Sequence, residues 1–471
     1  MASIVVGRTK EISDLNHYLK SGKAEFIALY GRRRVGKTYL ITGFFKNSFA
    51  FDTTGILEGN KTDEMDAFYT SLQNYGYEGP YPEKWMEAFN ILRSLLEPKI
   101  KRGRVVVFID EFPCFDTPRS GFVKALDYFW NSWASRQSNF FLIVCGSATS
   151  WMVKNLVDSR GGLHNRVTHE MHLHPFNLKE TELYLKSMHI DWDRMSILRT
   201  YMILGGIPYY LNMLRKDESP VKNIDRLFFG NQAELKGEYG RLYKSLFKSP
   251  ERYISVIRAL AKNKKGLSRK EIIGLTGLAE NGHLSDILDD LVNCDFIRYY
   301  NVTGKESNGG YYQLVDYYTH FYLDYGARKV KDSEYWTHML NTPAQNTWYG
   351  LAFERVCMDH VPQILHSIGI DRIQTDYYSW RSKATTPKSQ IDLMIDRADG
   401  IITICEMKYS ADTYQMTLTE AGKIATRLQN YISENSPKKG VQTALVTTVG
   451  LKPGKNADAV QNVIVLGDLF K

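Results

Sequence analysis

Apolar residues in the first third of the chain gather into short continuous runs, and stretches of helical periodicity separate the runs. The runs lie at residues 25–30, 105–109 and 140–144. Continuous apolar runs of this length are typical of strands in a parallel sheet that is covered on both faces. Amphipathic stretches between them, at residues 83–96 and 123–134, predict helices. The alternation of the two predicts an α/β domain.

The pattern turns helical at residues 177–246 and then changes again. Three short helices and a β-hairpin are predicted at residues 253–261, 269–276, 282–293, 296–300 and 311–314. This order is typical of a winged helix-turn-helix. Residues 331–342 are predicted to be a linker, and strands alternate with helices beyond it.

Composition narrows the class of protein only moderately. With 471 residues the chain is too long for one core, so two to four domains are expected. The content of 43% hydrophobic and 24% charged residues excludes a disordered chain. The net charge of +8 is compatible with nucleic acid and equally with an ordinary basic surface. Five cysteines without C-x-x-C spacing support neither a disulfide framework nor a zinc ribbon, which fits a reducing interior.

The sequence shows no targeting or membrane-spanning signal. The first residues lack the basic region and the long apolar stretch of a signal peptide. The longest apolar runs, residues 105–109 and 140–145, are far shorter than the roughly 20 residues that a membrane span requires. We therefore expect a cytoplasmic protein that does not enter a membrane.

A phosphate-binding loop follows the first strong strand. The motif G-x-x-x-x-G-K-[ST] is matched in full, and a helical segment follows it from Tyr39. In this motif backbone N–H groups wrap the phosphates, so Lys37 would reach the β- and γ-oxygens and Thr38 would ligate magnesium. The chain is therefore predicted to bind ATP with Mg²⁺. The predicted nucleotide-binding residues here are Gly31, Arg32, Arg33, Arg34, Val35, Gly36, Lys37, Thr38 and Tyr39.

Two acids end the strand at residues 105–109. Asp110 is predicted to hold magnesium through water, and Glu111 to orient and activate the attacking water. A glutamate at this place indicates hydrolysis rather than transfer to another substrate. Ser147, at the end of the next strand, is predicted to contact the γ-phosphate side, with a simple turn serine as the alternative.

An arginine in the loop that follows could stabilise the charge of the transition state. Arg166 is the predicted residue, Arg160 also qualifies, and a solvated arginine is the alternative. Such an arginine often acts in a neighbouring subunit, which would require a homo-oligomer. Four histidines lie nearby, and a metal site among them is conceivable: His164, His169, His172 and His174.

A second group of carboxylates lies near the C-terminus. Asp392 lies on a predicted strand, and Glu406 and Lys408 lie on the strand that returns after the turn at Asp399. Residues i and i+2 share a strand face, so Glu406 and Lys408 point the same way. Asp392 and Glu406 can then meet across the hairpin and hold magnesium on a phosphodiester, while Lys408 activates water or neutralises charge. Glu354, on the preceding helix, is a further predicted metal ligand.

Two other interpretations of these carboxylates stay open. They could form salt bridges on an ordinary hairpin, or belong to an inactive domain that only docks a partner. The predicted winged helix also allows two interpretations. Basic residues along one edge of it favour binding to nucleic acid. The predicted recognition helix, however, carries acids, which favour docking to a protein. The basic residues are Lys262, Lys264, Lys265, Arg269 and Lys270, and the acids are Asp286, Asp289 and Asp290.

Several motifs together resemble a prokaryotic AAA-type ATPase family that carries a winged helix and often a restriction-endonuclease-like domain. They are Val6, Gly7 and Arg8 with Glu11, the phosphate-binding loop, residues 108–112, residues 145–147 and residues 205–208. The resemblance implies that Val6 and Gly7 line the adenine pocket and that the sheet has the additional-strand order of AAA proteins. The spacing D-x(13)-E-x-K resembles the PD-(D/E)xK nuclease core, with Ile391 in place of the proline. Residues 158–162 depart from the family pattern, which leaves the choice of arginine open.

The predicted fold class is an α/β multidomain protein. Its predicted domains are a P-loop AAA-type parallel sheet at residues 1–174, a helical lid at 175–246, a winged helix at 247–328 and a restriction-endonuclease-like α/β domain at 343–471. The predicted function is ATP hydrolysis coupled to a metal-dependent nuclease that acts on nucleic acid, DNA rather than RNA. The alternative is a regulatory ATPase whose inactive nuclease-like and winged-helix domains only bind DNA or a protein partner.

Overall fold

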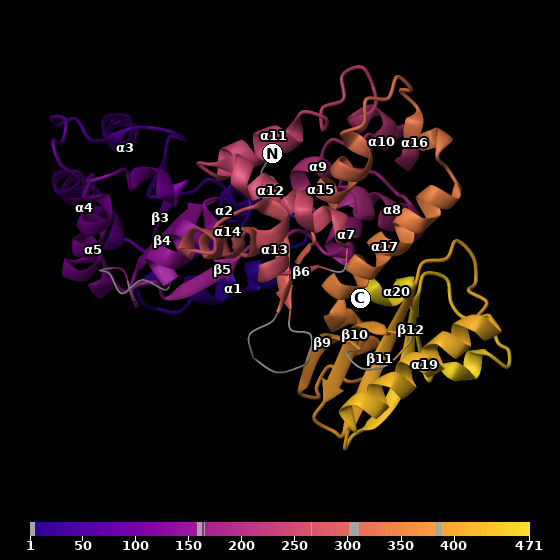
Figure 1. Cartoon of the computed structure of the whole chain (residues 1–471). Coiled ribbons are helices and arrows are strands. Elements are labelled where there is room, and N and C mark those ends of the chain that lie inside the picture. The colour runs from indigo at the N-terminus through magenta and orange to yellow at the C-terminus, as the bar shows by residue number, and fades with distance from the viewer. Residues whose placement is uncertain are drawn as a thin grey trace. The chain divides into compact units, whose positions relative to one another are not determined.

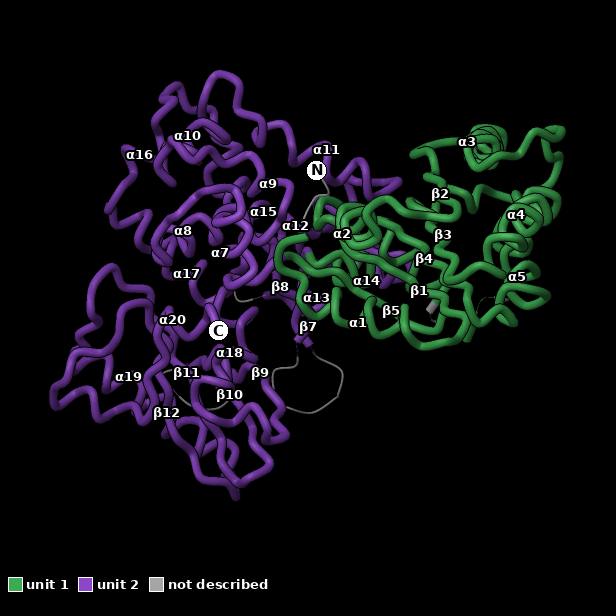
Figure 2. The backbone as a smooth tube through the Cα atoms, turned by 180° about the vertical axis from the view of Figure 1, so that it is seen from behind, with its two compact units in different colours: residues 1–175, 288–295 green, residues 176–287, 296–471 purple. Residues whose placement is uncertain are grey.

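The computed structural model describes residues 5–157, 163, 165–264, 266–300, 310–382, 386 and 388–471 (Figure 1). The chain divides into two compact units (Figure 2). Unit 1 takes the described residues of Met1–Pro175 together with Leu288–Asp295, and unit 2 takes those of Phe176–Ile287 and Phe296–Lys471. Among the described helices, none combines the length and the apolar character that crossing a bilayer requires.

Unit 1 is built on a parallel sheet of five strands. Across the sheet the order is β2 (Phe51–Thr54), β3 (Val105–Asp110), β4 (Phe140–Gly146), β1 (Glu25–Tyr30) and β5 (His169–His172). Every pairing is parallel, and β4 lies between β1 and β3, as the resemblance implies. The carboxyl ends of parallel strands meet at one edge of a sheet, so the segments after β1, β3 and β4 converge there.

Both faces of this sheet are covered, so β1, β3 and β4 are buried at every position and mostly apolar. On one face, alternate residues such as Phe26 and Val107 pack into a core that includes Trp85 and Phe122. On the other face, the Phe141 ring lies 5.9 Å from the Phe45 ring. The helices of unit 1 are α1 (Thr9–Leu19), α2 (Lys37–Phe44), α3 (Lys61–Asn74), α4 (Trp85–Ile100), α5 (Phe122–Ser132) and α6 (Thr149–Met152), with short turns at η1 (Phe112–Phe115), η2 (Ala134–Arg136) and η3 (Val153–Val157).

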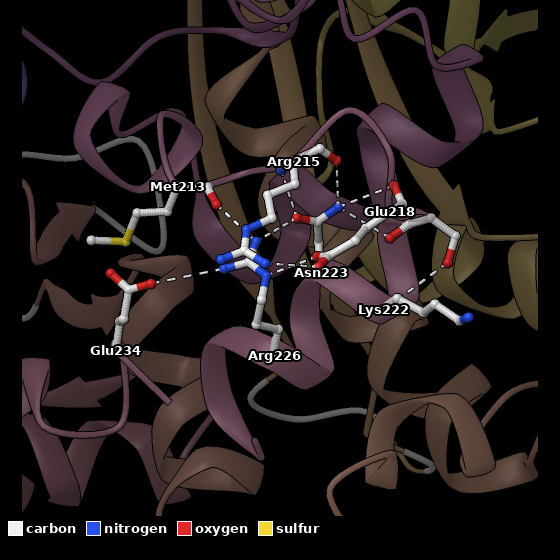
Figure 3. A network of polar contacts seen from close by, with 8 residues as sticks. Met213, Arg215, Glu218, Lys222, Asn223, Arg226 and Glu234 are labelled. Carbon is white, nitrogen blue, oxygen red and sulfur yellow. Dashed lines mark hydrogen bonds and ion pairs between the residues drawn. The ribbon is translucent and has the colours of Figure 1, made fainter. Parts of the chain in front are cut away.

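Unit 2 begins with the predicted helical region. Its helices are α7 (Leu178–Ser187), α8 (Arg194–Leu204), α9 (Pro208–Leu211), α10 (Pro220–Phe228) and α11 (Glu238–Leu246). A polar network fixes the turn that leads into α10 (Figure 3). The fully buried Asn223 side chain accepts from the Arg215 N–H and donates to the Arg215 and Glu218 carbonyls. Arg226 donates to Asn223, to Glu218 and to the Met213 carbonyl.

Replacing Asn223 by alanine is expected to lower the free energy of unfolding by at least about 2 kcal/mol, because each buried polar group left without a partner costs about 1–3 kcal/mol. Urea denaturation of the full chain measures this loss. Asn231, which is exposed, gives the matched control Asn231→Ala, expected within about 0.5 kcal/mol of the wild type. Equal stability of the two variants would contradict the structural role of Asn223.

The helices and hairpin predicted to form a winged helix follow in the predicted order. They are α12 (Pro250–Lys262), β6 (Leu267–Ser268), α13 (Arg269–Thr276), α14 (Gly282–Asn293), β7 (Ile297–Tyr300) and β8 (Tyr311–Leu314). The strands form an antiparallel sheet in the order β6, β8, β7. From Leu288 to its end, α14 belongs to unit 1. Lys265 of the predicted basic edge lies outside the described residues.

The predicted linker at residues 331–342 is wrong, because this segment is packed. It contains α16 (Tyr335–His338), where Trp336 is buried and its ring lies 4.9 Å from the Phe321 ring. The Trp336 N–H donates to Asp225 of α10. Charged residues surround Tyr335 and Trp336 in the sequence, so the pattern does not indicate that this turn is buried. The neighbouring elements are α15 (Tyr317–Phe321), η4 (Tyr322–Gly326), α17 (Pro343–Asp359) and α18 (Val361–Ser367).

Unit 2 ends in a separate mixed sheet of five strands. Its order is β13 (Asn462–Val465), β12 (Gly440–Thr447), β11 (Ile401–Lys408), β10 (Gln390–Arg397) and β9 (Thr375–Arg381). The pairs of β9, β10 and β11 are antiparallel, and those of β11, β12 and β13 are parallel. The helix α19 (Leu418–Asn435) connects β11 to β12 and places Tyr431 against Trp380 of β9. The turn η5 (Ala457–Ala459) and α20 (Leu466–Leu469) flank β13.

Candidate functional site

The loop between β1 and α2 has the conformation that the phosphate-binding motif requires. Gly31 and Gly36 have φ angles of 146° and 90°, and a Cβ on Gly31 would lie 2.3 Å from the Leu173 carbonyl oxygen. Glycine is therefore needed at Gly31 for space and at Gly36 for its left-handed backbone. α2 begins at Lys37, so the N–H groups of its first turn and the positive end of its dipole lie beneath the loop.

Lys37 lies at the centre of this loop. The side chain is buried, and its Nζ donates to the carbonyls of Gly31 (2.8 Å) and Arg32 (3.0 Å) and to Ser147 Oγ (3.1 Å). The structure therefore brings the motif lysine to the predicted sensor serine at the end of β4.

The two acids at the end of β3 join the same cluster. Thr38 Oγ1 donates to Asp110 Oδ2 at 2.7 Å, and Ser147 Oγ donates to Glu111 Oε1 at 2.9 Å. A hydroxyl and a carboxylate are the oxygen ligands that Mg²⁺ prefers, so Thr38 and Asp110 fit a magnesium ion bound to a nucleotide. Glu111 has a left-handed backbone (φ 44°) that turns it out of the strand direction.

The other predicted nucleotide-binding residues differ in how deeply they are buried. Arg32 and Val35 are buried, Arg33 and Arg34 are half-buried, and Tyr39 is exposed on α2. Val6 and Gly7, both half-buried, lead into Arg8. The buried Arg8 side chain donates to the Val35 carbonyl at 3.1 Å and so ties the segment of Val6 and Gly7 to the loop. Arg8 is not among the predicted site residues, although its position directly after Val6 and Gly7 could have indicated that it belongs to the site.

Arg166 is not brought to this cluster. It precedes β5 and lies near Asp127 of α5, with 3.8 Å between Arg166 Nε and Asp127 Oδ1. Because all five strands are parallel, the segment before β5 lies at the amino edge of the sheet, opposite the phosphate-binding loop. Arg166 could therefore serve as a finger only toward a neighbouring subunit. Arg160 lies outside the described residues.

Of the four predicted histidines, His169 lies apart from the pair of His172 and His174, and His164 lies outside the described residues. His169 stacks on Tyr18, with ring centroids 3.6 Å apart, and pairs with Glu25. His172 and His174 both reach Asp295, at 3.4 Å and 3.1 Å, in an arrangement that could hold a metal ion. Burial acts to raise the pKa of Asp295, but hydrogen bonds from the two histidines outweigh it and hold the pKa at about 2. Asp295 is 121 residues from His174, so no local pattern indicated that the two would meet.

In unit 2 the C-terminal carboxylates converge. The register of β10 and β11 pairs Leu393 with Cys405, and the next step of the same register sets Asp392 against Glu406. Glu354 of α17 and Asp392 both line a pocket of about 810 Å³. Glu406 is engaged at both oxygens, by Lys408 Nζ at 2.7 Å and by Arg427 of α19. Arg427 was missed, although the apolar residues Ile424, Leu428 and Tyr431 at helical spacing mark the buried face of α19 next to it.

The acids in this group act on one another. Burial, followed by the charge of Asp392, raises the pKa of Glu354 to about 7. Functional sites often contain a carboxyl whose pKa is raised by burial and by a neighbouring carboxylate. The folded chain then keeps a proton that the unfolded chain releases above its ordinary pKa, so the contribution of Glu354 to stability falls as pH rises from about 4.5 to about 7.

Glu354→Gln is therefore expected to raise the melting temperature in EDTA at about pH 7.5 and to change it little at about pH 4.5, where both side chains are neutral. Scanning calorimetry of wild type and variant at the two pH values measures the difference. A lower melting temperature of the variant at the higher pH would show that the charged carboxylate stabilises the fold.

The parallel sheet in the order 5-1-4-3-2, with a phosphate-binding loop after β1 and two acids after β3, defines a P-loop nucleoside triphosphatase. The model of a family described as an ATPase domain predominantly from Archaea matches residues 5–214. Residues 5–214 are therefore similar to an ATPase domain of the archaeal type, which supports ATPase activity.

Relatives of this chain come from Archaea. An uncharacterized protein of Methanocaldococcus jannaschii is 26% identical over 333 residues, which are 68% of this chain and 68% of that protein. An uncharacterized ATP-binding protein of the same organism is 50% identical over 42 residues, which are 9% of this chain and 71% of that protein. Among solved structures, the Walker-type ATPase paby2304 of Pyrococcus abyssi has a TM-score of 0.49 at 20% identity, over 68% of this chain and 96% of that one.

Proposed function

We propose that the chain couples ATP hydrolysis to a magnesium-dependent nuclease whose site is formed by Glu354, Asp392, Glu406 and Lys408. The observation that carries the proposal is the convergence of three acids and a lysine, from α17, β10 and β11, beside one pocket of about 810 Å³. Glu354 lines the pocket without taking part in the ion pairs that Glu406 forms with Lys408 and Arg427.

At the ATP site, the residues have complementary roles. Lys37 neutralises the β- and γ-phosphates, and Thr38 with Asp110 would hold Mg²⁺, which stabilises charge on the transferred phosphoryl group when bound. Glu111 orients the attacking water, and Ser147 holds Glu111 in place through the 2.9 Å hydrogen bond. The link from Ser147 to Lys37 makes the position of Glu111 depend on what occupies the loop.

At the second site, Asp392 and Glu406, with Glu354, would hold Mg²⁺, whose charge activates water and stabilises the phosphodiester. Lys408 lies on the same strand face as Glu406 and, as an ammonium group paired with it, neutralises charge and orients the attacking water by donating a hydrogen bond. The water releases its proton to the surrounding solvent. Water adds to phosphorus, the bond from phosphorus to one ester oxygen breaks, and that oxygen leaves with a proton. The same chemistry applies to DNA and RNA, and we propose DNA as the substrate.

The proposal assigns each part of the chain a task. Residues 1–174 hydrolyse ATP, residues 175–246 form a lid, residues 247–328 form a winged helix, and residues 343–471 carry the nuclease site. Arg166 lies at the amino edge of the sheet, so its role as a finger requires a homo-oligomer.

A second function is favoured by one observation. Both oxygens of Glu406 are already bound by Lys408 and Arg427, as in a salt-bridged surface. A regulatory ATPase would use this domain only to bind DNA or a protein partner.

Cleavage of single-stranded and plasmid DNA and of RNA, with Mg²⁺ or Mn²⁺ and with or without ATP, distinguishes the two functions. The proposal expects metal-dependent cutting whose rate changes with ATP in the wild type but not in Lys37→Ala. ATP hydrolysis without cutting under any of these conditions would overturn the nuclease and favour the regulatory ATPase.

A further inference from the structure

The pocket at Glu354 and Asp392 has two walls from different parts of unit 2. One wall comes from the predicted winged helix, with Lys264 before β6, Arg298 and Tyr300 on β7, and Gln313 on β8. The other comes from the C-terminal domain, where Lys388, Lys423 and Arg427 line the pocket. The acids of the proposed nuclease site thus lie between two basic surfaces.

The basic residues of the first wall are held in place. Arg298 Nε donates to Gln313 Oε1 at 2.9 Å, and its Nη1 lies 3.2 Å from Asp359 Oδ1. Gln313 Nε2 donates in turn to the Lys264 carbonyl at 2.7 Å. This chain of contacts fixes the backbone from which the Lys264 side chain extends. The wall is therefore organised before any ligand binds, which lowers the entropy lost on binding.

Three lysines give the pocket an excess of positive charge toward a ligand. Within the part of the chain that the structure describes, no carboxylate forms an ion pair with Lys264, Lys388 or Lys423. Arg298 and Arg427, by contrast, are already paired with Asp359 and Glu406. Lysines that face one groove from two sides and flank acids are an arrangement suited to a phosphate backbone that must approach a metal site.

The size of the pocket limits what can enter it. About 810 Å³ lies within the roughly 300–1,000 Å³ of small-ligand sites, which is room for a few nucleotides. The two grooves of a DNA duplex are each about 8 Å deep and lie on opposite sides, so a duplex is about 16 Å thick or more. A duplex is therefore too thick to enter a pocket of this volume. Tyr300 offers an aromatic ring on the wall, and single-strand sites commonly combine such rings with basic side chains.

We infer that this pocket binds a single strand of nucleic acid, and that the predicted winged helix supplies one wall of the groove through Lys264. The inference rests on the proposed nuclease function of the same site. The winged helix then holds the strand beside Asp392 instead of reading the major groove of a duplex with α14. The acids of α14 do not oppose this mode of binding.

Fluorescence anisotropy of the full chain carrying Asp392→Asn, which prevents cutting, tests the inference. The probes are labelled oligothymidylate, oligouridylate and a dA·dT duplex, across a series of salt concentrations. We expect at least about tenfold tighter binding of the single strands than of the duplex. Adding Lys264→Ala and Lys423→Ala should lower the salt slope for single strands by about 1.4, since each lost phosphate contact removes about 0.7.

The matched control carries Lys216→Ala and Lys438→Ala, which remove the same charge from exposed positions outside the pocket, and it should bind like the parent. Tighter binding of the duplex, or equal salt slopes for both double variants, would overturn the inference. If the wild type cuts nucleic acid but the pocket lysines do not affect single-strand binding, the proposed groove is rejected and the nuclease function stands. If the pocket lysines affect single-strand binding but the wild type does not cut, the groove stands and the nuclease function is rejected.

Discussion

Glu111→Gln is expected to slow ATP hydrolysis by about 100-fold or more while ATP stays bound. A positioned carboxylate that accepts a proton from the attacking water contributes roughly 10²–10⁴ in rate. Glutamine keeps the shape and can still accept from Ser147 Oγ, which lies 2.9 Å from Glu111 Oε1, but it cannot take the proton. Lys37, Thr38 and Asp110 are unchanged, so the groups that hold the nucleotide remain.

Phosphate release and the binding of a fluorescent ATP analogue, measured on the same preparation, separate the two effects. Lys37→Ala should lose binding as well as hydrolysis, because its Nζ lies at the centre of the loop. Glu58→Gln, an exposed glutamate of unit 1, is the matched control and should behave like the wild type. If Glu111→Gln hydrolyses ATP at a rate within about threefold of the wild-type rate, another group must activate the attacking water.

Asp392→Asn is expected to lower metal-dependent cleavage by at least about 100-fold, with the ATPase rate unchanged. Loss of a group that merely supports a metal ligand lowers affinity or activity by about 10–100-fold, and Asp392 is proposed as a ligand itself. Its position opposite Glu406 in the β10–β11 register leaves no neighbouring acid on that strand that could replace it, since Asp396 lies four residues further along.

Initial cleavage rates over a range of Mg²⁺ concentrations measure the effect, and calorimetry of magnesium binding shows whether the ion is lost. Asp376→Asn is the matched control, because Asp376 is an exposed aspartate on the adjacent strand β9 that does not line the pocket. Cleavage by Asp392→Asn equal to that of Asp376→Asn would place the cutting activity elsewhere, or in a contaminant.

The sequence predicted the parts of the fold that depend on local pattern. β1 begins and ends where its continuous apolar run predicts, because it has neighbouring strands on both sides that fix its burial. The phosphate-binding loop was recognisable because its glycines are needed for backbone geometry at fixed spacing. Asp392 and Glu406 could be expected on one hairpin because Asp399 and Gly400 mark a turn between their strands. The turn signal did not fix the register, because the loop between β10 and β11 has three residues, 398–400.

Contacts between distant segments could not be predicted in the same way. Asp295 meets His172 and His174 only because the chain from Leu288 to Asp295 joins unit 1. Arg427 reaches Glu406 from α19, and the sequence does not show that this arginine pairs with a residue 21 positions away. Arg166 was placed by analogy of position, whereas the parallel sheet puts it at the edge away from the loop.

The contacts of Glu406 also determine what the domain needs in order to fold. Lys408 and Arg427 carry two formal positive charges, Asp392 and Glu406 carry two negative ones, and Glu354 with its pKa of about 7 is half neutral at that pH. The cluster is thus close to electroneutral from the side chains of the chain alone. A structural zinc domain unfolds when its ion is removed, but this domain should stay folded in a chelator. Magnesium would then act on it as a ligand that is gained and lost in the native state, and its concentration could set activity without affecting the supply of folded protein.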